Sequence, residues 1–462
     1  VVVSSRLELQ PQASSSPLLL RGVDLTIESL AIDEVPLEPS EWSYEAGLLT
    51  IAKTPAQPFV LSTRCRIDPY NNSSLEGLYA SCGLLSTQCE AEGFRRISLH
   101  PDRPDVLSQW RVRIEAPRSS CPVLLSNGNP IAAEAVGADR HSVTWDDPFP
   151  KPSYLFALVA GDLREIRDSY TTSSGRDVAL RLHVEAGDEA FTGHAMASLK
   201  RSMAWDESVY NLEYDLDEYN IVAVRHFNMG AMENKSLNIF NSKLVLADAE
   251  TATDAELERI ESVIAHEYFH NWSGNRITCR DWFQLSLKEG LTVFRDQSFT
   301  ADLHSDSVKR IEDVSMLRNT QFREDAGPTA HPVKPAEYQA IDNFYTTTIY
   351  EKGAELIRML HTLLGKTRFM RGMATYVSRF DGTAATTEDF VQAIADGACA
   401  DGEPLGFDLV KFRQWYHQAG TPHLEVKRSW DAALGQMSVQ MRQATSVTPG
   451  QPVKEPLVLP LA

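Results

Sequence analysis

The sequence predicts a multidomain α+β fold: an N-terminal β-sandwich or saddle-shaped sheet, a central mixed domain and the start of a small β-sandwich. Apolar and polar residues alternate up to about residue 162, which is typical of half-buried strands. Long helical patterns begin at Ala190, and strand-like alternation returns after Gly420-Thr421-Pro422. We therefore expect domains at residues 1–162, 163–413 and 414–462, the last of them a partial β domain.

Individual strands and turns follow from the same pattern. In the N-terminal region, alternation predicts strands that include Val23–Ile27 and Trp110–Ile114. Pairs of Asp or Asn with Pro or Gly predict turns at Asp68-Pro69, Asn127–Pro130 and Asp147-Pro148. Later strands are expected at Val178–Val184, Ile221–Asn228, His423–Val426 and Met437–Met441.

A helix is predicted to contain the segment His266-Glu267-Tyr268-Phe269-His270, because the apolar residues around it recur at helical spacing. Thr253, with Glu256 three residues later, is a capping box that would start this helix, and Ser273-Gly274 is a natural stop. A second helix is expected to open near Leu287–Leu291.

The spacing of polar residues on these helices predicts a metal site. Two histidines four apart lie about 40° apart around a helix axis and about 6 Å along it, so His266 and His270 can bind one ion. Glu267 points into the same space, and Glu289 from the second helix would supply a third, anionic ligand. Such a set leaves one position of a tetrahedral zinc open for water, as in zinc hydrolases. The alternatives are a chance motif in a solvated helix and, for Glu289, an ordinary surface carboxylate.

Composition narrows the range of functions. The chain has 462 residues, 43% of them hydrophobic, and a net charge of −19, which argues against nucleic acid or an anionic membrane as a partner. No apolar run reaches the roughly 20 residues of a membrane span. The six cysteines lack C-x-x-C spacing and indicate reduced thiols in a reducing compartment.

A second motif, Gly230-Ala231-Met232-Glu233-Asn234, follows a predicted strand and precedes the histidine motif. With this motif, the chain resembles the gluzincin aminopeptidases and, among them, the aminopeptidase N branch of bacteria and plastids. The likeness covers nearly the whole chain in the expected order. Matching segments lie at residues 88–96, 266–276, 280–297 and 349–355.

The resemblance implies a thermolysin-like catalytic domain that binds one Zn²⁺ per chain through His266, His270 and Glu289. It implies that Glu267 is the general base for an attacking water and that Tyr350 donates a hydrogen bond to the oxyanion of the tetrahedral intermediate. Asp296 is a possible partner of a ligand histidine, judged by its position.

The same resemblance implies how a peptide with a free N-terminus is bound, and broad specificity is expected. Glu90 and Glu233 would bind the substrate ammonium. A further set of residues would contact the backbone or the first side chain of the substrate. These other residues are Met229, Gly230, Ala231, Met232, Asn234 and Tyr345.

Two departures from the family pattern stand out. Ser236 occupies a position where glycine is frequent, and we expect little consequence. Family members of this type end in a large helical domain that is missing here, which implies a truncated chain. We expect a monomer in the cytoplasm, or in a plastid or another organelle after removal of a transit segment.

Three alternatives stay open at this point. A thermolysin-type endopeptidase would share the zinc ligands but would have no use for Glu90 and Glu233. A bifunctional relative that also opens a lipid epoxide is expected to begin the motif with Gly-Gly, whereas this chain has Gly230-Ala231. A non-catalytic peptide-binding scaffold is expected to lose a ligand or the base, and none is lost.

Overall fold

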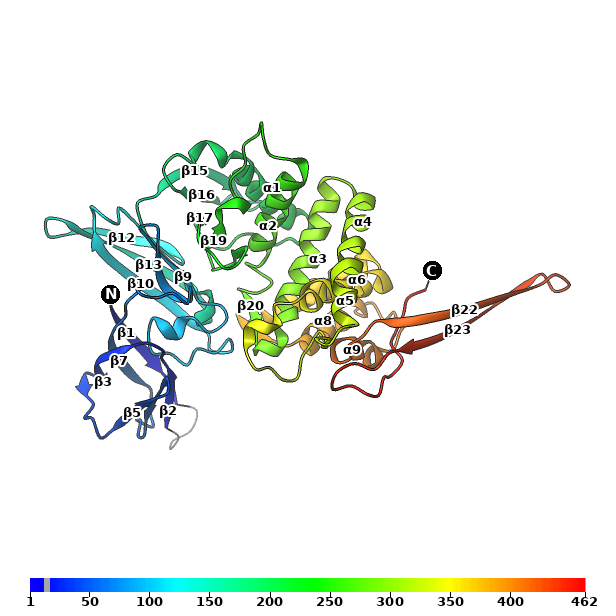
Figure 1. The fold of residues 1–462 in the computed structure, drawn as a ribbon, viewed down its shortest axis with the longest axis horizontal. Coiled ribbons are helices and arrows are strands. Elements are labelled where there is room, and N and C mark those ends of the chain that lie inside the picture. Colours follow the sequence, from blue (N-terminus) through cyan, green and yellow to red (C-terminus); the bar gives the residue numbers. More distant parts are fainter. Residues whose placement is uncertain (12–16, 462) are drawn as a thin grey trace. The chain divides into compact units, whose positions relative to one another are not determined.

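The computed structural model describes residues 1–11 and 17–461, which fall into two compact units (Figure 1). Unit 1 comprises Val1–Glu207 and Asn211–Asn271, and unit 2 comprises Ser208–Tyr210 and Trp272–Ala462. The predicted α+β class is confirmed. The units divide the chain within the predicted central domain, so the three-domain division stays a prediction. Within the described residues, no helix combines the length and the apolar character needed to cross a membrane.

Antiparallel sheets form the first part of unit 1, and their inward-facing residues build a core around Leu49, Leu61 and Cys65. One sheet consists of β1 (Val2–Leu9), β7 (Phe59–Arg66), β3 (Thr26–Ile32) and β4 (Val35–Pro36), and another of β2 (Leu18–Arg21), β6 (Leu48–Ile51) and β5 (Trp42–Glu45). The others consist of β11 (Val123–Ser126), β14 (Leu158–Gly161), β9 (Leu84–Gln88) and β8 (Gly77–Ser81), and of β10 (Ser108–Pro117), β13 (Arg140–Lys151) and β12 (Asn129–Val136).

Two expectations for this region were wrong in detail. The strand expected at Val23–Ile27 begins only at Thr26, because Asp24 has a φ of 56°, a left-handed conformation that a strand excludes. The turn expected at Asp147-Pro148 lies inside β13, at an irregularity where the pairing with β10 shifts register. Such a bulge tolerates a proline that a regular ladder would reject.

The second part of unit 1 is a mixed sheet covered by helices. Its order is β15 (Arg164–Thr171), β16 (Asp177–Val184), β17 (Glu218–Val224), β19 (Leu237–Asn241) and β18 (Ala231–Met232). Every residue of β17 is buried, as expected for a central strand with parallel neighbours on both sides. The strand expected at Val178–Val184 is confirmed, whereas the one expected at Ile221–Asn228 ends at Val224. The helices are α1 (Gly193–Tyr210) and α2 (Asp254–Phe269).

Unit 2 is mainly helical, with a core that includes Leu360, Phe369, Phe390 and Phe412. Its helices are α3 (Leu285–Leu303), α4 (Asp306–Met316), α5 (Phe322–Asp325), α6 (Gly353–Leu364), α7 (Lys366–Phe380), α8 (Thr387–Ala398) and α9 (Leu409–His417). Two π-helical turns, η6 (Leu317–Gln321) and η8 (Thr348–Lys352), precede α5 and α6, and β20 (Ile277–Cys279) pairs with β21 (Thr383–Ala385). Short 3₁₀ turns in the chain are η1 (Phe94–Arg96), η2 (Ser153–Leu155), η3 (Glu189–Phe191), η4 (Ser242–Leu244), η5 (Trp282–Gln284) and η7 (Ile341–Phe344).

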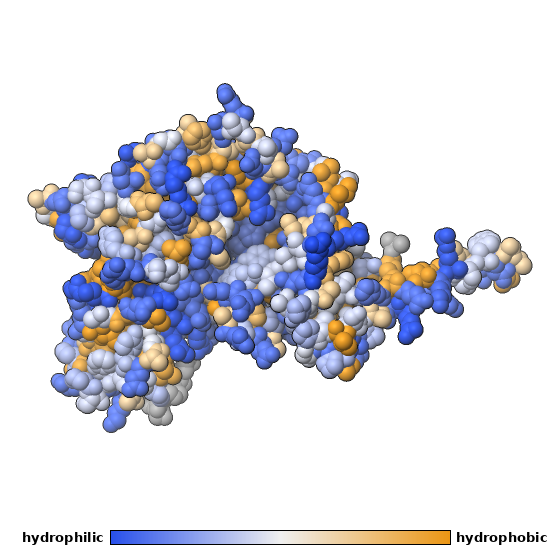
Figure 2. All heavy atoms as spheres, in the orientation of Figure 1, coloured by the Kyte–Doolittle hydropathy of each residue, from blue (hydrophilic) through white to orange (hydrophobic). Residues whose placement is uncertain are grey.

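A long antiparallel hairpin, β22 (Pro422–Asp431) with β23 (Gln436–Thr445), confirms the strands expected there. Val426 pairs with Met441 and Trp430 with Met437, so these side chains share one face of the ribbon. All four are exposed, and Figure 2 shows apolar surface along this hairpin.

Candidate functional site

Helix α2 carries the histidine motif and starts as predicted. The Thr253 hydroxyl accepts a hydrogen bond from the Glu256 backbone (3.2 Å), and the Glu256 carboxylate accepts one from the Thr253 backbone (2.8 Å). This capping box satisfies amide groups that would otherwise have no partner in the first turn. The helix ends at Phe269 with His270 as its cap, before the predicted stop at Ser273-Gly274.

His266 and His270 face one another at the end of this helix. Their Nε2 atoms are 3.0 Å apart, and the rings meet edge to face at 84°. Two nitrogens bound to one tetrahedral zinc at about 2.05 Å would be about 3.3 Å apart. The pair therefore fits a shared metal ion after a shift of a few tenths of an ångström.

Three carboxylates of unit 1 lie in a connected group that includes His270. Ligand atoms of Glu233, Glu267 and His270 lie within 4.8 Å of one another, and carboxylate oxygens of Glu90 and Glu233 approach within the same distance. Each of these glutamates is less than 10% exposed, at 7% (Glu90), 3% (Glu233) and 6% (Glu267). Complete burial, and then the Glu267 carboxylate, raise the pKa of Tyr219 well above its ordinary value.

The Gly-Ala-Met-Glu-Asn segment lies at the edge of the mixed sheet. The Asn241 amide donates to the Gly230 carbonyl (2.9 Å), and β18 pairs with β19. Gly230 is exposed, Met229 and Ala231 are half-buried, and Met232 is buried. Asn234 is fully buried, and its side-chain amide makes no hydrogen bond with the residues that the structure describes.

Lys235, which the sequence did not single out, and Ser236 hold this segment in place. The Lys235 ammonium binds the Asp215 carboxylate at 2.7 Å and the Asn271 side-chain carbonyl at 3.2 Å, so it ties the motif to the residue after His270. Ser236 has a φ of 60°, which explains why glycine suits this position. The Ser236 hydroxyl accepts a hydrogen bond from the backbone of Gly128 at 2.7 Å, which offsets part of the strain.

Glu289 lies on α3 in unit 2, where it is 2% exposed and bound by the Lys288 ammonium at 2.6 Å. The next residue, Gly290, faces Gly353 at the start of α6 so closely that a Cβ atom would come within 2.8 Å of the Gly353 backbone. The Ser286 hydroxyl also donates to the Ile349 carbonyl at 2.8 Å. The two glycines therefore allow α3, with Glu289, to pack directly against the turn that bears Tyr350.

Tyr350 is half-buried in the π-helical turn η8, and its ring centroid lies 6.5 Å from that of Tyr345. These two predicted site residues thus lie together.

Asp296 is 7% exposed and lies seven residues after Glu289 on α3, which places both on one face of the helix. Its predicted contact with a ligand histidine stays a prediction.

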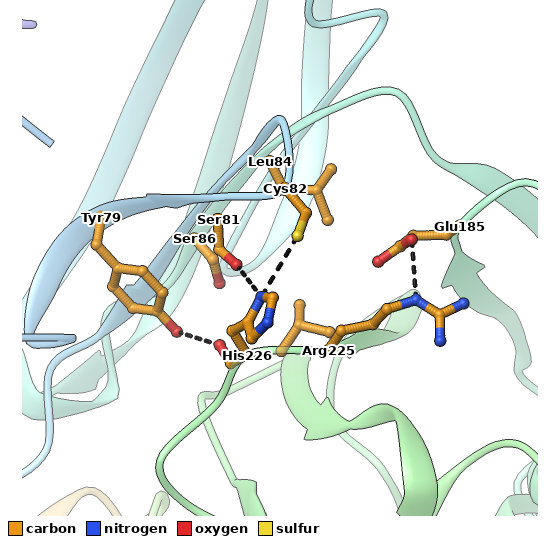
Figure 3. A pocket seen from close by; sticks show the side chains of 9 residues that line it. Tyr79, Ser81, Cys82, Leu84, Ser86, Glu185, Arg225 and His226 are labelled. Carbon is orange, nitrogen blue, oxygen red and sulfur yellow. Dashed lines mark hydrogen bonds and ion pairs between the residues drawn. The ribbon is translucent and has the colours of Figure 1, made fainter. Parts of the chain in front are cut away.

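Another group of reactive side chains lines a small pocket in unit 1 (Figure 3). Cys82 lies at the tip of the β8–β9 turn, and its Sγ atom is 3.4 Å from Nδ1 of His226. The Ser81 hydroxyl contacts the same nitrogen at 2.8 Å, and the Tyr79 hydroxyl donates to the His226 carbonyl. No pattern in the sequence predicted that these residues would lie together. The described residues include all six cysteines, and all six are free thiols, as predicted.

Comparison with known proteins agrees with this arrangement. A profile of the Peptidase M1 N-terminal domain matches residues 2–155, and one of the Peptidase family M1 domain matches residues 194–415. A third, a domain of unknown function with an Ig-like fold, matches residues 420–462. Aminopeptidase N of Caulobacter vibrioides is 56% identical over 92% of this chain and 48% of its own length. Aminopeptidase N of Escherichia coli is 54% identical over 97% of this chain and 51% of its own length.

The fold is also that of a solved relative. The crystal structure of Legionella pneumophila aminopeptidase A in complex with aspartic acid aligns with a TM-score of 0.88 at 35% identity. The alignment covers 96% of this chain and 50% of that protein. The chain spans about half the length of the curated relatives it matches. Two family profiles together cover most of the sequence, several relatives are more than half identical, and the fold is shared. This chain therefore belongs to peptidase family M1.

Proposed function

We propose that this chain carries the catalytic residues of a zinc-dependent aminopeptidase that removes single residues from the amino terminus of peptides with broad specificity. The position of Glu233, close to both Glu90 and Glu267, is the main support for this proposal. It places a pair of carboxylates, Glu90 and Glu233, beside the helix that bears the proposed metal ligands His266 and His270, all within unit 1. The relatives above are named aminopeptidases, which supports the same activity.

One Zn²⁺ per chain would be held by His266, His270 and Glu289. The facing Nε2 atoms on α2 and the buried carboxylate on α3 are the ligand types that zinc prefers, and their spacing in the sequence suits one ion. When bound, such an ion lowers the pKa of water towards about 7 and polarises a carbonyl group.

The protein's own groups would move the protons. Glu267 would accept a proton from the attacking water and pass it to the leaving amine, since its carboxylate lies beside His270. Tyr350 would donate its hydroxyl to the developing oxyanion. Losing a donor of this kind raises a barrier by about 3 kcal/mol.

Glu90 and Glu233 would bind the α-ammonium of the substrate and so measure one residue from the terminus to the cut bond. Two buried carboxylates this close favour a cation between them, because their mutual repulsion is then offset. The Legionella aminopeptidase A was solved in complex with aspartic acid, and an amino acid of this kind carries the same ammonium group.

Other residues of the edge segment would contact the rest of the substrate. Gly230 and Ala231 offer backbone groups at the open edge of β18, where a peptide can add as a strand. Asn234 offers a buried amide without a described partner, and such groups usually bind ligand or water. Met229, Met232 and Tyr345 would line the first side-chain pocket or support it. The monomeric state and the cytoplasmic location stay predictions.

Hydrolysis of alanyl-, leucyl- and arginyl-anilides by the zinc-loaded chain, compared with their N-acetyl forms, tests this function. Turnover confined to the free amines and lost in Glu267→Gln is expected. Equal cleavage of the acetylated forms would reject the roles of Glu90 and Glu233 and favour an endopeptidase.

A further inference from the structure

The turn that bears Tyr350 is held at its amino end by the side chain of Glu324, the penultimate residue of α5. One oxygen of this carboxylate accepts hydrogen bonds from the Thr348 backbone (2.8 Å), the Thr348 hydroxyl (2.5 Å) and the Thr347 hydroxyl (3.2 Å). The carboxylate therefore gives a hydrogen-bond partner to an amide group at the start of the turn. Its negative charge also interacts favourably with the positive end of the peptide dipoles there.

The next residue, Asp325, holds the other end of the same turn. The Lys352 ammonium lies 2.7 Å from one Asp325 oxygen, with both side chains buried. The carboxylate also accepts from the Gly420 backbone (2.7 Å) and the Thr421 hydroxyl (3.0 Å). Burial alone would raise the pKa of Asp325, but the Lys352 ammonium, the Gly420 amide and the Gln321 side chain outweigh it and hold that pKa below its ordinary value. A buried ion pair with its remaining positions satisfied is rigid, and it is costly to break from one side.

Further contacts leave the turn little freedom. The Gln321 amide donates to the Thr348 hydroxyl at 3.3 Å. On the opposite side, the close approach of Gly290 and Gly353 and the hydrogen bond from Ser286 fix the turn against α3. Tyr350 lies midway between the two ends that the acidic residues hold. π-Helical turns are uncommon in proteins, but those that do occur are often found at functional sites. The contacts that support this turn therefore bear on function as well as on core packing.

We infer that Glu324 and Asp325 are positioning residues that hold the Tyr350 hydroxyl where the oxyanion forms. The inference rests on the proposed function of Tyr350. Because Asp325 also binds Gly420 and Thr421, the segment before β22 becomes part of the support for the reacting group. A donor displaced by about 1 Å loses much of its effect on rate, up to about a hundredfold.

Asp325→Asn is the direct test, and Asp147→Asn is its matched control. Asp147 forms an equally buried ion pair with Lys151 at 2.9 Å, but it lies in unit 1 and makes no part of the turn. Both variants are expected to lower the melting temperature. Only Asp325→Asn should lower kcat for leucyl-anilide, by at least tenfold, with KM and zinc content unchanged. Equal kcat effects in the two variants would overturn the inference.

Glu324 supplies a second pair of variants that preserves the ion pair. Glu324→Gln keeps an oxygen that can accept from Thr348, so kcat should stay within about threefold of the parent, whereas Glu324→Ala should lose at least tenfold. A Glu324→Ala chain that keeps its full kcat would contradict the positioning role.

Binding of an aminophosphinic peptide, whose tetrahedral phosphinate imitates the oxyanion, gives a readout that does not need turnover. Asp325→Asn should weaken this ligand at least tenfold and leave binding of free leucine unchanged. When Tyr350 is already replaced by phenylalanine, adding Asp325→Asn should cause no further loss of affinity for the phosphinate. A loss that persists there overturns the positioning inference alone, whereas a Tyr350→Phe chain that binds and turns over normally overturns the proposed role of Tyr350 and this inference with it.

Discussion

Carboxylate oxygens of Glu90 and Glu233 lie within 4.8 Å of one another, although the first follows β9 and the second follows β18 at the edge of another sheet. Each is nearly fully buried. Replacing either by glutamine should raise KM for leucyl-anilide about tenfold or more, because each carboxylate contributes a short charge-assisted contact to the ammonium. Steady-state kinetics measure this, and Glu92→Gln, which removes the same charge two residues from Glu90, is the control. An unchanged KM in both variants would contradict the ammonium site.

Metal content separates the ligands from the base. His266→Ala, His270→Ala and Glu289→Ala should each reduce bound zinc from one per chain to a small fraction after dialysis, because a ligand is lost. Glu267→Gln should keep its zinc and lose its activity, because it would lack only the proton acceptor. Elemental analysis of dialysed protein distinguishes the two classes. Full zinc in Glu289→Ala would reject Glu289 as a ligand.

Cys82 should be the thiol that reacts fastest in the folded chain. It is exposed, whereas burial raises the pKa of the Cys65 and Cys89 thiols and keeps them protonated. The release of coloured thiolate from dithiobis(nitrobenzoate) should show a rapid phase of one equivalent. Cys82→Ser should abolish that phase and Cys399→Ser should leave it intact; the reverse pattern would show that exposure does not decide reactivity here.

His100 predicts a pH dependence of stability. Burial lowers its pKa from 6.5 to about 4, and its Nδ1 accepts a hydrogen bond from the Asp102 backbone at 3.1 Å. The unfolded chain therefore binds a proton more readily, so this residue favours folding above pH 6.5 and loses that contribution as the pH falls towards 4. The full loss is about 3 kcal/mol.

Urea unfolding at several pH values tests this expectation. The difference in midpoint between the parent chain and His100→Gln should shrink steadily between pH 6.5 and pH 4.5, since glutamine does not titrate. Parallel curves would show that another group controls stability in this range.

Helix α2 was predictable because its signals are local. Thr253 and Glu256 cap it in the way their spacing indicates, and His266 and His270 face each other as two residues four apart on a helix must. Its end was predicted too late. The helix ends at Phe269, and the Asn271 amide donates to the Tyr268 carbonyl (3.0 Å), only three residues earlier, so the last turn is already tightened before the local stop signal.

The remaining features depend on partners that no local pattern reveals. The strand through Asp147-Pro148 exists because β10 pairs across the irregularity, and β10 lies far away in sequence. Glu324 and Asp325 look like ordinary acids at the end of a short helix, and only the packed structure brings them to Thr348 and Lys352. In the same way, Glu90 would pass for a solvated carboxylate without its approach to Glu233.

The two ends of α2 have opposite electrostatic needs. Asp254 and Glu256 in its first turn suit the positive end of the peptide dipoles, whereas the last turn, with His266 and His270, is the negative end. A divalent cation bound there by the histidines would also offset the negative end of the helix. Ion and helix would then stabilise each other, so an ion bound more tightly would also raise the melting temperature of the chain.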